Sequence, residues 1–187
     1  MQGADAIMDI PPTTPFEILA DYERRSLAHE AGEPEQIETP GLWRGIGFRV
    51  GERQLATSID EINELLMPQP LTTVPGTQTW LLGISNVRGN LMPVVDLGCF
   101  LFDVRTRMSD RCRWLVMRQQ GSTVGLLVDE VVGQRNLGDE QRAAAEAEGD
   151  ERLTRFVDEV VTLDGRQIAL FSMSRLARAP DFLQATL

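Results

Sequence analysis

The feature that most constrains the fold is a series of short strands separated by glycine-containing turns, which begins near residue 44 and runs through most of the chain. In the first of these runs, Ile46, Phe48 and Val50 alternate with glycine and arginine, as in a strand with one buried face. Further on, Asp164-Gly165 separates two apolar runs and is typical of a hairpin turn. Many short strands at such spacing favour small barrels, because closure leaves no unpaired strand edge.

The strand pattern occurs twice. Leu55 to Ile62 aligns with Val124 to Val131, 69 residues later, and both segments end in Ile or Val, Asp, Glu, Ile or Val. The hairpin Gly89 to Leu97 aligns with Gly165 to Met173, 76 residues later. We therefore expect two barrel units of about 70 residues each. Pro93 lies inside a strand of the first unit, which predicts that this strand is at a sheet edge or beside a bulge.

Residues 1–40 differ in composition and are expected to form an N-terminal arm. Prolines are frequent at the start, whereas residues 16–30 place apolar side chains at helical spacing. Thr14 and Glu17 have the spacing of a capping box, which marks the beginning of this helix. Such a helix either packs on its own protein or binds a partner, and the sequence leaves both alternatives open. The side chains that would contact a partner are Phe16, Leu19 and Tyr22. Residues 41–180 are expected to form the β domain, and residues 181–187 a C-terminal tail.

Charge and side-chain inventory exclude several functional classes. The 187 residues include 18 basic and 28 acidic ones, and the net charge of -10 repels nucleic-acid phosphates and anionic membrane surfaces. A small barrel that binds oligonucleotides is the alternative from another functional class, and it would need a basic groove. Every basic residue is arginine, so a Schiff-base or phosphate-binding lysine is excluded. The single histidine, His29, cannot build a metal site or a two-histidine relay.

No catalytic set is visible. Neighbouring carboxylates such as Asp60-Glu61 point to opposite faces of a strand and do not form an acid–base pair. Asp96 lies in an apolar strand, where it is either a reactive acid or a surface or turn-capping carboxylate. Cys99 and Cys112 lack an activating histidine and are expected to stay thiols in a reducing compartment. We therefore expect no enzymatic activity, no metal and no cofactor. Because no apolar targeting or membrane-spanning segment is present, the sequence predicts a cytoplasmic protein.

The segment Gly83 to Leu97 reads Gly-Ile-Ser-Asn-Val-Arg-Gly-Asn-Leu-Met-Pro-Val-Val-Asp-Leu, and it resembles the signature of CheW-like adaptor domains. Val124 to Val132 resembles the second signature of that family, and the likeness covers about residues 44–178. This resemblance implies a mostly β fold of two intertwined five-stranded SH3-like barrels, with short helices and a hydrophobic groove between the barrels. The arm, which begins Pro-Phe-Glu-Ile-Leu at Pro15, resembles the N-terminal extension of PilI-type members, which serve twitching motility.

The resemblance also implies a role without catalysis. CheW-like adaptors couple the cytoplasmic hairpin tip of a methyl-accepting chemoreceptor to the regulatory domain of a CheA-like histidine kinase. The PilI likeness assigns this role to type IV pilus motility, with flagellar chemotaxis as the alternative pathway. By alignment, the receptor-contact positions fall on Ile62, Gly83 and Arg88, and the turn and structural motif falls on Gly89, Pro93 and Asp96.

Two interpretations of Arg88 stay open. It is either an interface arginine, a residue type common at binding hot spots, or an arginine that ties its own hairpin to a neighbouring segment. Glycine at position 83 is expected to let the backbone of a receptor helix approach closely.

Overall fold

The computed structural model describes residues 14–28, 42–119, 121–138, 142–144, 150–163 and 166–185. The chain consists of two compact units, residues 1–38 and residues 39–187. Within the described ranges, no helix is long and apolar enough to cross a bilayer.

The first unit contains one described helix, α1 (Pro15–Ala28). The predicted capping box closes its beginning: the Thr14 backbone N–H donates to Glu17 Oε2 at 3.0 Å, and the Glu17 N–H donates to Thr14 Oγ1 at 3.3 Å. Asp21 forms an ion pair with Arg25 one turn further on, at 2.8 Å. The predicted helix is confirmed to residue 28, and its last two residues, 29 and 30, lie outside the described residues.

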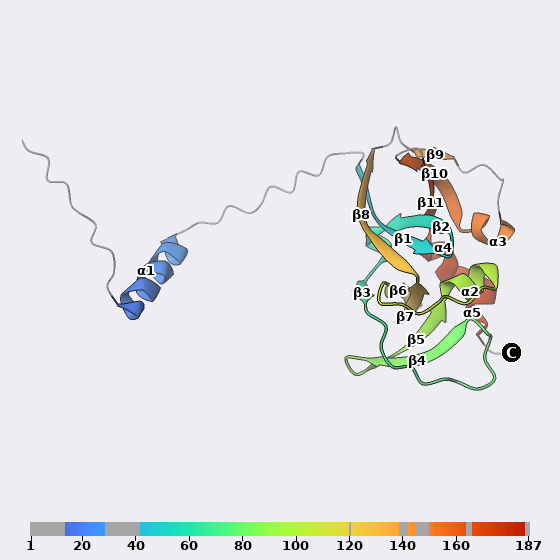
Figure 1. Ribbon diagram of the computed structural model, residues 1–187, viewed down its shortest axis with the longest axis horizontal. Coiled ribbons are helices and arrows are strands. Elements are labelled where there is room, and N and C mark those ends of the chain that lie inside the picture. The colour runs from blue at the N-terminus through green and yellow to red at the C-terminus, as the bar shows by residue number, and fades with distance from the viewer. Residues whose placement is uncertain are drawn as a thin grey trace, which may run out of the picture. The chain divides into compact units, whose positions relative to one another are not determined.

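The second unit is a β domain with short helices (Figure 1). Its elements, in chain order, are β1 (Leu42–Val50), β2 (Arg53–Ser58), the 3₁₀ turn η1 (Ile59–Glu61), β3 (Glu64–Leu66), β4 (Leu81–Val87), β5 (Asn90–Asp96), α2 (Leu97–Phe102), β6 (Arg113–Gln119), β7 (Ser122–Val128), β8 (Glu130–Gly138), β9 (Arg142–Ala144), α3 (Glu151–Thr154), β10 (Val157–Leu163), β11 (Arg166–Phe171), α4 (Met173–Arg178) and α5 (Pro180–Leu183). Among the described residues, one sheet has the order β8-β1-β2-β11-β10-β9 and the other the order β3-β6-β7-β5-β4.

The internal repeat is present in the strand register. The hairpins β1–β2 and β10–β11 meet through a parallel contact in which Leu170 lies opposite Ala56. The hairpins β6–β7 and β4–β5 meet through a second parallel contact in which Val94 lies opposite Gly125. The two contacts superimpose under the predicted offsets, since Ala56 and Gly125 are 69 residues apart and Val94 and Leu170 are 76 apart. Each sheet therefore combines hairpins from both halves of the chain, and the two barrel units are intertwined.

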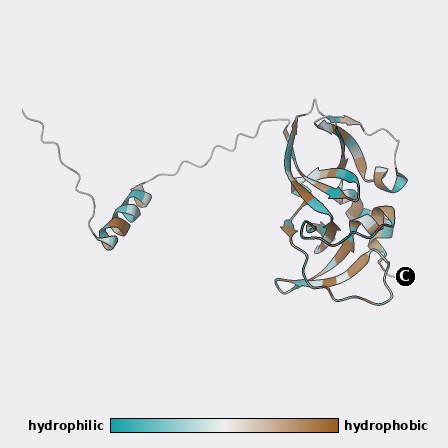
Figure 2. Ribbon diagram, viewed as in Figure 1, coloured by the Kyte–Doolittle hydropathy of each residue, from teal (hydrophilic) through white to brown (hydrophobic). Residues whose placement is uncertain are grey.

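Three groups of buried apolar side chains form the core, and brown segments on the strands and helices follow them in Figure 2. The smallest, in the first sheet, contains Ala56, Leu137, Val161, Ile168 and Leu170. A second, in the other sheet, contains Met92, Val94, Cys112, Trp114, Val116 and Leu127. The largest takes side chains from both sheets and from α2 to α5, including Phe48, Leu97, Phe100, Phe171 and Phe182. Much of the space between the barrels is therefore filled by core, with each buried large side chain contributing about 1.5–3 kcal/mol.

Pro93 lies in β5, which is an inner strand between β7 and β4. The prediction of an edge strand is therefore wrong, and its alternative, a neighbouring bulge, is confirmed by a register shift between Leu81 and Gly83 on β4. The pairing with β7 begins at Val94. Pro93 thus precedes that ladder, and its missing N–H breaks no bond there.

Two other segments differ from their predicted conformations. The pattern after Ile59 predicts a short helical or irregular turn, but Glu64–Leu66 forms a strand because its backbone pairs with β6. The pattern of residues 139–148 predicts a helix or loop, whereas Arg142–Ala144 pairs with β10 as a strand, and the rest of this segment lies outside the described residues. At the C-terminus, α5 places the Phe182 ring against Trp80, so this part of the predicted tail packs on the domain.

Candidate docking site

The β4–β5 hairpin ends in a two-residue turn made by Arg88 and Gly89, one residue earlier than the predicted Gly89-Asn90 turn. Both residues have left-handed backbones, with φ of 53° and 85°. Tight hairpins favour this geometry because it matches the twist of the strands. Glycine adopts it freely, whereas an arginine does so at a cost of about 1–2 kcal/mol. Asn86 Oδ1 accepts a hydrogen bond from the Gly89 N–H at 2.9 Å and holds the turn.

Arg88 forms a two-point ion pair with Glu64 on β3. Its Nη1 donates to Glu64 Oε2 at 3.2 Å, and its Nη2 donates to Oε1. The pair joins β4 and β3, the two outer strands of the sheet. This geometry matches the interpretation in which Arg88 ties its hairpin to a neighbouring segment. The Arg88 side chain is nevertheless 73% exposed, and exposed pairs contribute only about 0–1 kcal/mol, so a partner's carboxylate can compete for it.

Ile62 lies on the same extended segment as Glu64. Its N–H donates to Ile59 O at 3.2 Å and ends η1, and the next N–H, of Asn63, donates to Val116 O at 2.8 Å. The Ile62 side chain is half-buried and packs against the largest core group. The structure therefore brings two of the three predicted contact residues to one region, with Glu64 as the link between them. Exposed apolar surface continues there at Leu65, which is 41% exposed.

Gly83 is buried in β4 and has φ of 143°. A Cβ at this position would lie 2.4 Å from the backbone oxygen of Thr72, whose segment forms a bridge with Ile84. The space beside Gly83 is thus occupied by the chain itself. The predicted reason for glycine, the close approach of a receptor helix, is therefore corrected: glycine is needed for packing within the domain.

A surface pocket of about 230 Å³ lies where η1, β6 and α4 meet. It joins the two sheets, because β6 belongs to one and α4 follows the last strand of the other. Its lining residues are Asp60, Glu61, Asn63, Met117, Arg118, Met173 and Ser174. It is next to Ile62 in the chain and offers a concave surface between the barrels, where the resemblance implies a groove.

Glu61 holds this pocket together. Its Oε1 accepts from the Ser174 N–H at 3.0 Å, and its Oε2 accepts from the Met173 N–H at 3.0 Å and from Thr57 Oγ1 at 2.9 Å. Burial raises the pKa of Glu61, but these hydrogen bonds to the charged form outweigh it, and the pKa is lowered from its ordinary value of 4.5. The carboxylate therefore stays ionised and ties η1 to the beginning of α4.

Asp96 is a capping carboxylate. It is 1% exposed and accepts hydrogen bonds from the Cys99 N–H at 3.1 Å, the Thr106 N–H at 2.9 Å and Thr106 Oγ1 at 2.7 Å. These bonds begin α2 and anchor the loop that follows it. Ser172, its equivalent in the second half of the repeat, begins α4 in the same way.

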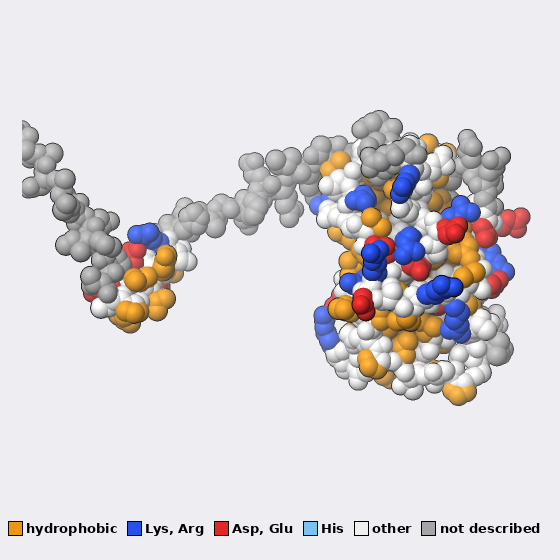
Figure 3. Space-filling model, in the orientation of Figure 1, with side chains coloured by type: hydrophobic (Ala, Val, Ile, Leu, Met, Phe, Trp, Pro, Cys, Tyr) orange, Lys and Arg blue, Asp and Glu red, His pale blue; other side chains and the backbone are white. Residues whose placement is uncertain are grey.

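The arm residues lie on α1 in the first unit. Phe16, Leu19 and Tyr22 are 80%, 67% and 63% exposed, and Figure 3 shows apolar side chains gathered on one side of this helix. Their predicted contact with a partner stays a prediction.

Nothing in the described part of the chain suggests a metal centre, since no three side chains of the ligand types cluster there. Cys99 and Cys112 are buried thiols. The sequence reasoning missed Glu64 and Glu61 as site residues. The repeated Asp-Glu pair pointed to Glu61, but no local signal marks Glu64 as the partner of Arg88.

The fold and the site have relatives among known proteins. A model of the CheW-like domain family matches residues 44–181. The chain is 39% identical over 123 residues to Protein PilI of Pseudomonas aeruginosa, and the match covers 66% of this chain and 69% of that relative. It is 29% identical over 110 residues to the Chemotaxis protein CheW of Helicobacter pylori, covering 59% of this chain and 66% of the relative. Scaffolding protein TtCheW from Thermoanaerobacter tengcongensis has the same fold, with a TM-score of 0.61 and 24% identity over 70% of this chain and 89% of that one.

Proposed function

The chain belongs to the CheW-like domain family, and on this premise we propose that it is a non-catalytic scaffold that couples a methyl-accepting chemoreceptor to a CheA-like histidine kinase. The names of its relatives, chemotaxis proteins and a scaffolding protein, support the general role. The likeness to PilI supports control of type IV pilus twitching motility over the alternative, flagellar chemotaxis. Both partners would present their domains in the cytoplasm, which is where we propose that the protein acts.

One observation carries the proposal: the exposed Arg88–Glu64 pair lies beside Ile62, on the segment that leads into a concave surface between the barrels. A receptor tip is a helical hairpin, and a helix can lie along such a surface. Covering Ile62 would contribute about 1.5–3 kcal/mol if its side chain became fully buried. Arg88 would exchange Glu64 for a carboxylate or carbonyl of the receptor, and its planar guanidinium suits both acceptors.

Two variants test the receptor surface. Ile62→Asp removes the apolar contact, and Arg88→Gly removes the guanidinium while relieving the left-handed strain, so the hairpin should stay folded. Each should weaken binding to the receptor tip by tenfold or more, about 1.4 kcal/mol, and leave binding to the kinase regulatory domain unchanged. Arg53→Ala, at an exposed arginine on β2, is the control and should bind both partners normally. Titration calorimetry with each partner separately, together with thermal melts, measures this.

Equal losses for both partners would mean that Arg88 only braces its hairpin, and the receptor surface would lie elsewhere. The pathway is tested in cells. Deleting the gene should abolish twitching and leave flagellar swimming intact, whereas the opposite phenotype would favour the flagellar alternative. With purified components, the protein should change kinase activity only when receptor is present.

A further inference from the structure

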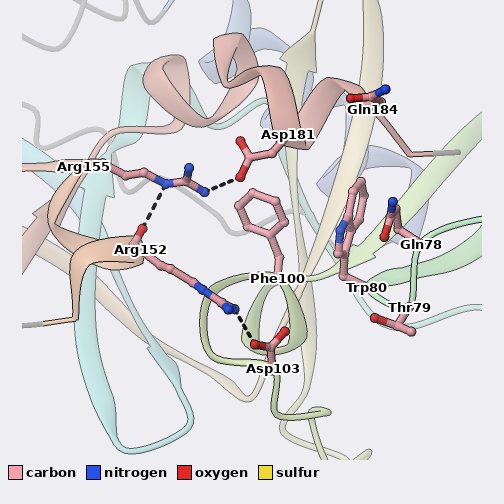
Figure 4. Close-up of a pocket in the computed structure, with 9 residues that line it drawn as sticks. All are labelled: Gln78, Thr79, Trp80, Phe100, Asp103, Arg152, Arg155, Asp181 and Gln184. Atoms are coloured by element: carbon pink, nitrogen blue, oxygen red, sulfur yellow. Dashed lines mark hydrogen bonds and ion pairs between the residues drawn. The ribbon is translucent and has the colours of Figure 1, made fainter. Parts of the chain in front are cut away.

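A second and larger pocket, of about 360 Å³, lies between α2, α3, α5 and the residues just before β4 (Figure 4). Two aromatic rings, Trp80 and Phe100, occupy its centre. The Trp80 ring stacks on Phe182, with centroids 5.8 Å apart and planes inclined by 8°, and Phe100 meets Trp80 edge-on at 5.4 Å. Because neighbouring rings hold both in place, the pocket has a rigid aromatic floor. Its volume is within the range of sites that take a ligand or an anchoring side chain.

Two arginines form one side of this pocket, which we call the Trp80 pocket. Arg152 on α3 is paired with Asp103 after α2, and Arg155 is paired with Asp181 on α5. Arg155 is also held by its Nε, which donates to Arg152 O at 3.3 Å, and by the Phe156 ring 4.5 Å away. Each guanidinium uses one terminal nitrogen for its aspartate. Within the described residues, the other terminal nitrogen of each makes no hydrogen bond.

The Trp80 pocket is distant from the proposed receptor surface. Trp80 immediately precedes β4 and Arg88 immediately follows it, so β4, seven residues long, separates them by roughly 23 Å. Figure 1 shows the same separation, with the β4–β5 turn at one end of the strands and α5 near the other. An adaptor that holds two proteins at once needs two surfaces that do not overlap, and these two satisfy that requirement.

We propose that the Trp80 pocket docks the kinase regulatory domain through a segment that carries a large apolar side chain next to an acidic one, an inference that rests on the proposed function. The apolar side chain covers Trp80 and Phe100, and the carboxylate binds the terminal nitrogens of Arg152 and Arg155 that the aspartates leave unused. Aromatic and arginine side chains around a pocket, with polar groups at its rim, are typical of binding hot spots. Arg152 and Arg155 are 50% and 41% exposed, so a docking segment can reach them.

Two substitutions on one ion pair should act in opposite directions. Arg152→Gln removes a donor and leaves Asp103 to repel the acidic segment, so binding to the kinase regulatory domain should weaken by threefold or more. Asp103→Asn frees Arg152 from its ion pair, so binding should strengthen by at least twofold. Asp103 has φ of 56°, and asparagine accepts this left-handed conformation well, so the helix end should be preserved. A structural role alone would give two losses.

The measurement is titration calorimetry of the full chain against the kinase regulatory domain and, separately, against the receptor tip. Arg44→Gln, at an exposed arginine on β1, is the control and should bind like the unmodified protein. Both effects should shrink in 0.5 M NaCl, since salt screens exposed charges. Receptor binding should not change in any variant, and the melting temperatures should agree within about 2 °C.

Unchanged kinase binding in Arg152→Gln and Asp103→Asn would overturn the proposal and leave the adaptor function intact. Changes of the same sign, or changes in receptor binding instead, would also overturn it. If the unmodified protein binds neither domain, the proposed function fails and the assignment of this pocket fails with it.

Discussion

At Gly83 and Arg88 the backbone adopts conformations that side chains disfavour, and the two residues differ in what this serves. Gly83 lies under the backbone of Thr72, where no Cβ fits, so it serves the packing of its own domain. Arg88 is open to solvent at the tip of a hairpin, where glycine would be more stable. A strained and exposed arginine with an ion pair that can be exchanged is better explained by binding than by folding.

Gly83→Ala should therefore destabilise the domain itself. The added Cβ meets the Thr72 oxygen at 2.4 Å and also strains φ, so we expect a loss of about 2–4 kcal/mol in the free energy of unfolding, measured in urea. Gly76→Ala is the matched control, since Gly76 has φ of 72° and open space around it, and it should cost about 1 kcal/mol. A Gly83→Ala protein as stable as the unmodified one would show that the loop over β4 moves away easily.

At the scale of elements, Glu61 connects η1 to α4 across 112 residues of sequence. Because folding lowers the pKa of Glu61, its ionised form contributes stability above the ordinary pKa of 4.5, and this contribution is lost as the pH falls through the lower folded pKa. Glu61→Gln removes the charge at every pH. The melting temperature of the unmodified protein should exceed that of Glu61→Gln at pH 7, and the difference should shrink below about pH 4.5. A difference that is constant from pH 7 to pH 3 would contradict this.

The arm gives a second test at this scale. Deleting residues 1–40 removes α1 and leaves β1 complete, since β1 begins at Leu42. We expect the remaining domain to melt cooperatively within a few degrees of the full chain, and to bind one of its two partners more weakly, because the exposed stripe of α1 is lost. Circular dichroism and the two titrations measure this. An aggregated or unfolded product would mean that the arm is part of the core.

At the scale of the whole domain, neither half of the repeat contains a complete sheet. Residues 39–109 supply β1 to β5, which belong to two sheets, and residues 110–187 supply the strands that complete both. Each fragment alone would leave its hairpins without their parallel neighbours and the largest core group without half its side chains.

Each fragment alone should therefore be unfolded, and an equimolar mixture should regain the β signal and a cooperative melt. Far-ultraviolet circular dichroism and size-exclusion chromatography of the fragments and of their mixture test this. A cooperative melt of the first fragment by itself would show that the two units fold independently.

The sequence by itself determined the local features of this protein. Hairpins such as β10–β11 and the capping box at Thr14 depend on residues a few positions apart, so turn chemistry and periodicity predict them. The repeat, the likeness to CheW-like adaptors and the absence of a lysine are likewise properties of the chain alone. They are enough to predict a mostly β adaptor.

Only the tertiary structure decided which distant groups meet. It showed that hairpins are exchanged between the halves, that Glu64 pairs with Arg88 across 24 residues, and that Thr72 covers Gly83. It also assembled the Trp80 pocket from three helices that follow different strands. Such contacts are selected by the packing of whole elements after long loops have closed, and local periodicity carries no information about which elements will become neighbours.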